Sequence, residues 1–172
     1  GGGVAVLGWV VIEVGRVGCG TRPFGLQQCG ITADVVTIAK GRASGCPRGR
    51  GAAREEGGAA LGPGDRGSTF GGSCLAVAAA RATVRELSEG GIAEQVEQVG
   101  AYMRQCLAAL PHVDQVRGLG LMVPVDFDVD ARAPDVALTG LASALLPNFT
   151  GPHTLRILPP LTCTREQAAA QI

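Results

Sequence analysis

Lysine, histidine and aromatic residues are scarce in this chain of 172 residues. Lys40 is the single lysine among 15 basic residues, there are 2 histidines, and aromatic residues make up 3% of the sequence. The 6 cysteines are dispersed without a C-x-x-C pair and without histidines close by, so neither a zinc site nor a disulfide framework is indicated. Free thiols in a reducing compartment fit this pattern better.

Long apolar runs and an excess of either charge are also absent. No run reaches the roughly 18–20 apolar residues that cross a bilayer, so we expect no membrane span and a cytoplasmic location. The 15 acidic residues balance the 15 basic ones, which leaves no global field to attract nucleic acid. The cluster of Arg48, Arg50 and Arg54 could contact RNA or phosphate. No aromatic residue lies among them for base stacking, so a solvated loop is the favoured interpretation.

The stretch around Lys40 is the most informative one. Val35 to Ala39 form a short run rich in β-branched residues, which predicts a buried strand, and Lys40 follows at the carboxyl end, where open α/β sheets place ligands. A buried ammonium group can lose its proton and attack a carbonyl, whereas a guanidinium group cannot. Any Schiff base formed by a side chain must therefore involve Lys40. The alternative is a lone surface lysine in an arginine-biased composition.

A second glycine-rich stretch, Pro63 to Gly72, carries the adjacent hydroxyl groups of Ser68 and Thr69. Hydroxyl and backbone N–H groups ahead of a helix can bind an anion. Ser and Thr also cap helices without any ligand. By itself the stretch leaves both interpretations open.

Helix signals are clear in the second half of the chain. One helix is predicted to begin near Ser73, with Leu75, Val84 and Leu87 on its apolar side, and to stop at Gly90-Gly91. The further predicted helices are an amphipathic one over Ile92–Leu110, one over Pro134–Leu146, and a last one that begins with a capping box of Thr164 and Gln167.

Strand signals lie between these helices. A strand pair is expected over Val113–Phe127, turning at Arg117–Gly120, and another strand over Thr154–Leu158. The aspartates at 126, 128 and 130 lack the glycine and glutamate of a calcium loop, so they predict a solvated strand end.

Five motifs, taken together, resemble one enzyme family. They are A-D-V-V-T-I-A-K-G (Ala33–Gly41), G-C-P-R-G (Gly45–Gly49), P-G-D-R-G-S-T-F-G-G (Pro63–Gly72), V-R-G-L-G-L-M (Val116–Met122) and L-R-I-L-P-P-L (Leu155–Leu161). This set resembles the class-III pyridoxal-phosphate (PLP)-dependent aminotransferases over nearly the whole chain. The resemblance implies an α/β fold, the carboxyl-terminal part of the PLP-transferase type I fold. Residues 1–88 would belong to the large PLP-binding domain with its parallel sheet, and residues 89–172 to a small α/β domain truncated at its last helix.

The resemblance also implies roles for single residues. Lys40 would be the Schiff-base lysine and would shuttle the proton during transamination. Thr69 would bind the cofactor phosphate across a homodimer interface, and Ser68 beside it would meet the substrate. Arg156 would hold a substrate carboxylate, a task that suits its planar fork.

The strand ahead of the lysine departs from the family pattern. The family reads D-E-V-Q there, with the aspartate on the pyridine nitrogen and the glutamine on the ring hydroxyl, whereas this chain reads Ile12-Glu13-Val14-Gly15. Val14 would still pack on the cofactor ring. Glu13 would replace the missing aspartate only if the strand slipped by one residue, which would turn its neighbours to the opposite face. Without that carboxylate the cofactor is a weaker electron sink.

The reaction implied is amino-group transfer from N-acetylornithine to 2-oxoglutarate in arginine biosynthesis, so the partners would be a small-molecule amino donor and a 2-oxo acid. Ornithine, 4-aminobutyrate or another ω-amino donor would use the same residues. A truncated, non-catalytic remnant of the family is the alternative from another functional class, and an RNA-binding module is the least favoured one.

Overall fold

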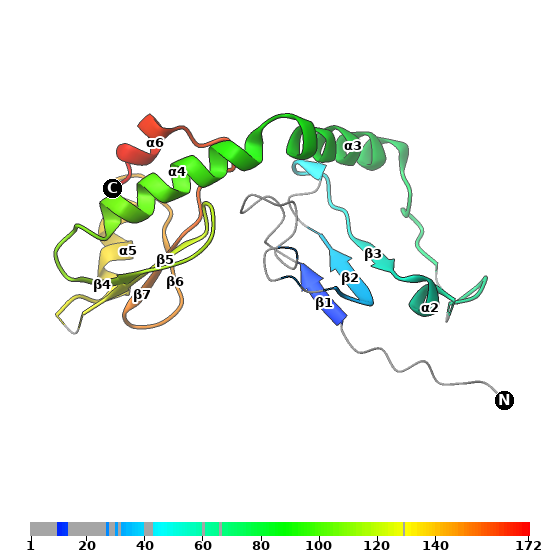
Figure 1. The fold of residues 1–172 in the computed structure, drawn as a ribbon, viewed down its shortest axis with the longest axis horizontal. Helices are drawn as coiled ribbons and strands as arrows, with labels where there is room; N and C mark the ends of the chain where they lie inside the picture. Colours follow the sequence, from blue (N-terminus) through cyan, green and yellow to red (C-terminus); the bar gives the residue numbers. More distant parts are fainter. Residues whose placement is uncertain are drawn as a thin grey trace. The chain divides into compact units, whose positions relative to one another are not determined.

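A computed structural model describes residues 10–13, 27, 30, 32–39, 43–59, 61–65, 67–128 and 130–172. Among these residues, those up to Gly90 form one compact unit and those from Gly91 to Ile172 form a second (Figure 1). We call them the first unit and the second unit. Both combine helices with strands, and no helix of the described residues is long and apolar enough to cross a membrane.

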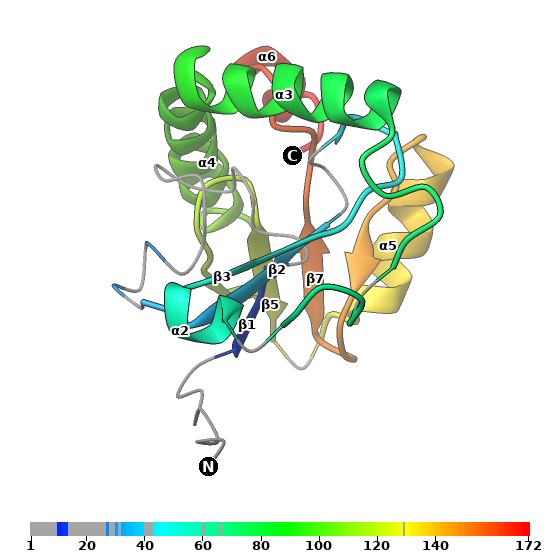
Figure 2. The same ribbon diagram turned by 90° about the vertical axis from the view of Figure 1, so that its right-hand side faces the viewer.

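The first unit is built on a sheet with the strand order β1-β2-β3. Strands β1 (Val10–Glu13) and β2 (Val35–Ile38) are parallel, and β3 (Arg50–Ala53) is antiparallel to β2. Figure 2 shows β2 and β3 running alongside one another. The short helix α2 (Glu55–Gly58) follows β3, and the long helix α3 (Cys74–Glu89) completes the unit.

The second unit is an antiparallel sheet with helices packed on one face. Its strand order is β4-β5-β7-β6, with β4 (Val113–Val116), β5 (Val123–Phe127), β6 (Asn148–Phe149) and β7 (Thr154–Ile157). The helices are α4 (Ile92–Leu107), α5 (Ala133–Ala142) and α6 (Arg165–Ala169). All three helices contribute to one core with β5 and β7, and its largest fully buried side chains are Met103, Leu121, Val96, Val123 and Val125.

Several sequence predictions are confirmed by these elements. Strand β2 lies where the β-branched run predicted it, and α3 ends at Glu89, with Gly90 as its C-cap and Gly91 as the N-cap of α4. The capping box of α6 is reciprocal: Gln167 N–H donates to the Thr164 hydroxyl, and Thr164 N–H donates to the Gln167 side chain. Helix α4 has five buried residues, and four of them, Val96, Val99, Met103 and Leu107, recur at the three- and four-residue steps of the predicted amphipathic helix; the fifth is Gly100.

Other predictions were wrong in detail. Residues 50–53, predicted to be part of a solvated loop, form β3, although all four side chains are exposed. The predicted apolar side of α3 is also not the buried one, because Leu75 is 76% exposed while Ala80 is buried. Small residues allow close packing against the first unit, so Ala80 faces the protein although leucine is the more apolar side chain. Helices α4 and α5 end at Leu107 and Ala142, earlier than predicted.

Candidate functional site

The residues predicted to meet the cofactor ring belong to the end of β1 and the chain beyond β2. The parallel ladder aligns Ile12 with Thr37 and Glu13 with Ile38, so the carboxyl ends of the two strands lie at the same edge of the sheet. Glu13 is the last residue of β1. Lys40 and Val14 lie outside the described residues, and their predicted roles stay predictions.

Ser68 and Thr69 lie in an exposed turn ahead of α3. Gly71 N–H donates to the backbone carbonyl of Ser68 at 3.1 Å, which closes the turn. The helix begins only at Cys74 with Ser73 as its N-cap residue, so neither Ser68 nor Thr69 caps it. Within the part of the chain that the structure describes, neither hydroxyl has a hydrogen-bond partner. The capping interpretation is therefore wrong, and both hydroxyls remain open to a ligand.

Arg156 lies in the middle of β7, in the second unit. Its neighbours across the sheet are Pro124 on β5 and Asn148 on β6. Leu155 and the β5 residues Val123 and Val125 are buried in the core, so the alternation of strand residues places Arg156 on the opposite face. Arg156 is a half-buried residue, and among the described residues its guanidinium has no ion-pair or hydrogen-bond partner. Such a group can receive a carboxylate.

An ion pair between Arg117 and Asp126 lies on the same face of this sheet as Arg156, and the sequence analysis did not predict it. Arg117 donates from Nε to Asp126 Oδ2 at 2.7 Å and from its second terminal nitrogen to Oδ1 at 3.0 Å. Asp126 Oδ1 also accepts the hydroxyl of Thr154 at 2.6 Å. We call these three residues the Asp126 network. The hydrogen bonds from Arg117, and then that from Thr154, lower the pKa of Asp126, and Asp126 in turn raises the pKa of Arg117.

The aspartates at 126, 128 and 130, which were predicted to form one solvated strand end, therefore differ in their hydrogen-bond partners. Asp126 is held in the network, with a side chain 21% exposed. Asp128 accepts from the backbone N–H of Asp130 at 2.9 Å and lies 3.1 Å from His112 Nδ1. The prediction is wrong for Asp126. The signal that could have revealed it was Arg117 in the turn, facing an acidic residue on the following strand.

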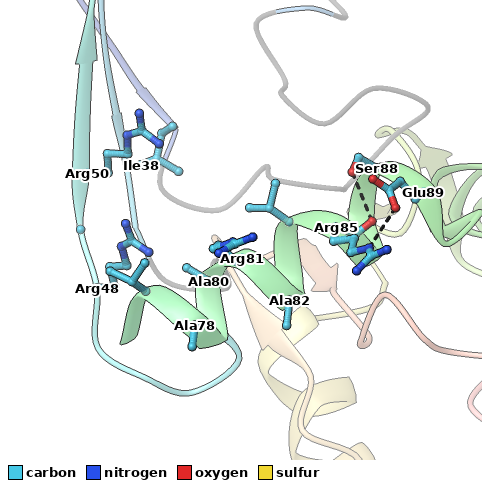
Figure 3. Close-up of a pocket in the computed structure, with 13 residues that line it drawn as sticks. Ile38, Arg48, Arg50, Ala78, Ala80, Arg81, Ala82, Arg85, Ser88 and Glu89 are labelled. Carbon is cyan, nitrogen blue, oxygen red and sulfur yellow. Dashed lines mark hydrogen bonds and ion pairs between the residues drawn. The ribbon is translucent and has the colours of Figure 1, made fainter. Parts of the chain in front are cut away.

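A separate hollow of about 870 Å³ lies within the first unit, between the β2–β3 region and α3 (Figure 3). It is lined by apolar residues, including Ile38 and Ala80, and by four arginines: Arg48, Arg50, Arg81 and Arg85. Neither Ser68 nor Thr69 lines it. It is therefore not the predicted anion site.

The predicted arginine cluster is engaged by the first unit itself. Arg48 donates to the carbonyl of Ala76 at 3.5 Å, and Arg54 lies 3.8 Å from Asp34. Two of the three arginines thus have a polar partner within the first unit.

Comparisons with known proteins agree on one family. Residues 12–172 match the family described as Aminotransferase class-III. The acetylornithine aminotransferase of Caldanaerobacter subterraneus subsp. tengcongensis is 37% identical over 166 residues, a match that covers 94% of this chain and 41% of that enzyme. The chain thus spans about two fifths of the length of this relative.

Solved structures share the fold. An ornithine aminotransferase from Toxoplasma gondii, crystallised with oxidised glutathione and partly occupied by PLP at its active site, gives a TM-score of 0.83 and 27% identity, over 94% of this chain and 40% of that one. The N-acetylornithine aminotransferase from Stenotrophomonas maltophilia gives a TM-score of 0.80 and 27% sequence identity, over 94% of this chain and 44% of that one. These similarities confirm the α/β fold class expected from the sequence.

Proposed function

Because the chain belongs to the class-III aminotransferases, a family that depends on PLP, we propose that its residues serve amino-group transfer from N-acetylornithine to 2-oxoglutarate in arginine biosynthesis. The coarse reaction follows from the family, and the amino donor from the acetylornithine aminotransferases among its relatives. Ornithine and 4-aminobutyrate remain the competing donors.

The observation that carries this proposal is Arg156. A transaminase must fix a substrate that ends in a carboxylate, and Arg156 presents an unpaired guanidinium, within the described residues, on the face of the sheet opposite the core. The guanidinium fork orients a carboxylate through two parallel hydrogen bonds. Orientation of the substrate relative to the reacting carbon then reduces the entropic part of the barrier.

Ser68 and Thr69 support the cofactor part of the proposal. Neither hydroxyl has a partner among the described residues. The Thr69 hydroxyl is suited to bind the cofactor phosphate, and the Ser68 hydroxyl is suited to bind a group of the substrate. PLP, when bound, would supply the aldehyde carbon that takes up and releases the amino group and the electron sink that stabilises the negative charge formed during the transfer. Lys40 would hold the cofactor and move the proton at its Nζ atom. Position 12 offers no carboxylate, and Glu13 is the nearest acidic residue along β1.

The proposed domain assignment follows the same family. We assign residues 1–88 to the carboxyl-terminal part of the large PLP-binding domain and 89–172 to the small domain, and the division of the described residues at Gly90 supports this. A cytoplasmic homodimer, in which Thr69 serves the site of the partner, completes the proposal.

The single lysine makes the cofactor test unambiguous. The chain is incubated with PLP, reduced with borohydride and digested, and the peptides are weighed by mass spectrometry. We expect a pyridoxyl group on the peptide that contains Lys40. Besides this lysine, the amino terminus of the chain is the other amine that can react with PLP. Lys40→Arg, which keeps the charge, should abolish that adduct. An adduct at the amino terminus alone would overturn the cofactor role.

The substrate test follows once the cofactor is bound. N-acetylornithine should discharge the lysine-dependent visible absorbance band faster than ornithine or 4-aminobutyrate at equal concentration. Faster discharge by either competitor would reassign the donor. A stable band that no donor discharges would favour the non-catalytic member of the family.

A further inference from the structure

The register between β5 and β7 brings Asp126 close to Arg156. Asp126 lies opposite Thr154, and Pro124 lies opposite Arg156, so all four share the face of the sheet away from the core. Asp126 and Arg156 are thus diagonal neighbours, for which backbone separations are roughly 7–8 Å, within reach of a long side chain. An uncommitted Asp126 would compete, as a fixed carboxylate, for the same guanidinium that a substrate needs.

The Asp126 network removes that competition. Both oxygens of Asp126 are occupied, Oδ2 by Arg117 Nε at 2.7 Å and Oδ1 by Arg117 and by Thr154 at 2.6 Å. Arg117 uses its fork in the bidentate geometry that binds carboxylates best. The result is one arginine that is paired and one, Arg156, that has no partner among the described residues.

The backbone fixes Arg117 in the position that this pairing requires. Its N–H donates to the carbonyl of Pro124 at 3.1 Å. Gly118 follows at φ +111°, and a Cβ atom there would overlap the carbonyl oxygen of Met122. On the other side of the turn, Arg104 donates to the carbonyl of Gly120 at 3.0 Å. The turn that carries Arg117 is therefore tied to both β5 and α4.

We propose that Arg117 is a positioning residue: by occupying Asp126 it keeps Arg156 unpaired and available to the carboxylate of the substrate. This inference rests on the proposed function, in which Arg156 receives that carboxylate. It assigns a role to the arginine of the V-R-G-L-G-L-M motif, which touches neither substrate nor cofactor in the proposal.

The first test needs no activity and no cofactor. Side-chain Nε–Hε signals of the arginines are recorded by NMR for the full chain, and Arg156 is assigned by its loss in Arg156→Lys. In Arg117→Ala we expect the Arg156 signal to shift and its exchange with water to slow, because Asp126 captures it. The double variant Arg117→Ala/Asp126→Asn should return the signal to its wild-type position. An Arg156 signal that is unchanged in Arg117→Ala would overturn the proposal.

The second test measures binding of 2-oxoglutarate by calorimetry. Exposed ion pairs are weak, so capture of Arg156 in Arg117→Ala should raise the dissociation constant only about 3- to 5-fold. The double variant should restore it to within about 2-fold, and Asp126→Asn alone should bind no more weakly than wild type. Weaker binding by Asp126→Asn would indicate that the network merely supports the fold and would overturn the proposal. Arg117→Lys, which keeps the charge but loses the fork, should give an intermediate value and replaces Arg117→Ala if that variant does not fold.

The two tests separate this inference from the proposed function. If wild type does not bind 2-oxoglutarate although Arg117→Ala shows the NMR shift, the carboxylate role of Arg156 fails while the pairing role of Arg117 stands. If wild type binds and Arg117→Ala is unchanged in both tests, the proposed function stands and this inference fails.

Discussion

The two units differ in how they bury apolar side chains. The second unit has one continuous core, in which Met103, Leu121 and Val123 are fully buried. In the described part of the first unit, the buried apolar residues are Ala33, Ile38, Ala43 and Ala80, only one of them larger than alanine, while Phe70 is 87% exposed. The second unit thus has a core built from larger side chains, whereas the described part of the first unit buries little beyond alanine, although both units also leave large apolar side chains exposed.

A core truncation in the second unit should have the largest effect. Met103→Ala removes a fully buried side chain and should lower the free energy of unfolding by about 2–5 kcal/mol. Leu75→Ala in α3 is the matched control, and because that side chain is 76% exposed it should change stability by roughly 0.5 kcal/mol or less. Urea unfolding followed by circular dichroism measures both. Equal losses would remove the contrast between the units.

Glycine substitutions give the next largest contrast. A Cβ atom on Gly100 of α4 would overlap the backbone of Gly120, so Gly100→Ala should cost about 1–3 kcal/mol even though alanine favours helix. At Gly51 of β3 nothing lies within 4 Å of an added Cβ, so Gly51→Ala should be close to neutral. Thermal midpoints of the two variants test this. A midpoint of Gly100→Ala at or above that of wild type would contradict the close helix–turn contact.

Acid should weaken the second unit through Asp126. Because its pKa in the folded state is lowered, chiefly by hydrogen bonds from Arg117, its contribution is fully present above the unfolded value of about 3.9. That contribution is lost as the pH falls through the lower folded value. In Asp126→Asn, the free energy of unfolding that is lost between neutral and acid pH should be smaller than in wild type, by about 1 kcal/mol or less. Stability measured from neutral pH down to about pH 2 is the test, and parallel curves for the two proteins would refute the assignment.

The smallest expected difference between the two units is in the rate at which their cysteine thiols react, and it does not involve stability. Cys74 at the start of α3 is exposed, whereas Cys163 is 4% exposed and burial raises the pKa of its thiol. Iodoacetamide at neutral pH should therefore modify Cys74 well before Cys163. Peptide mass spectrometry identifies the site. Early labelling of Cys163 would mean that the core of the second unit opens readily.

Local sequence signals predicted those elements that depend on nearest neighbours. The strand before Lys40, the stop at Gly90-Gly91 and the Thr164 capping box each follow from a few adjacent residues. Strand β3 did not follow, because its exposed R-G-A-A residues have no alternation and pair only through their backbone with β2. The buried face of α3 depends likewise on what packs against it.

The candidate site divides in the same way. Ser68, Thr69 and Arg156 could be chosen from motifs, and their predicted roles await the tests above. Within the Asp126 network only the pair of Arg117 and Asp126 had a local sequence signal, because the third member, Thr154, lies on β7, 28 positions away from Asp126. Such a contact exists only once the strand register is set.

Helix α6 completes the core of the second unit by packing against α4, although the two helices are far apart in the sequence. Ala168 is fully buried with residues of α4, Gln95 donates to the carbonyl of Cys163 at 3.2 Å, and Arg165 lies 4.4 Å from the ring centroid of Tyr102. About 60 residues separate the end of α4 from Ala168. At synthesis rates of about 5–20 residues per second, the apolar face of α4 waits roughly 3–12 s on the ribosome for its last partner. During that interval it is a surface that chaperones can bind and on which nascent chains can aggregate.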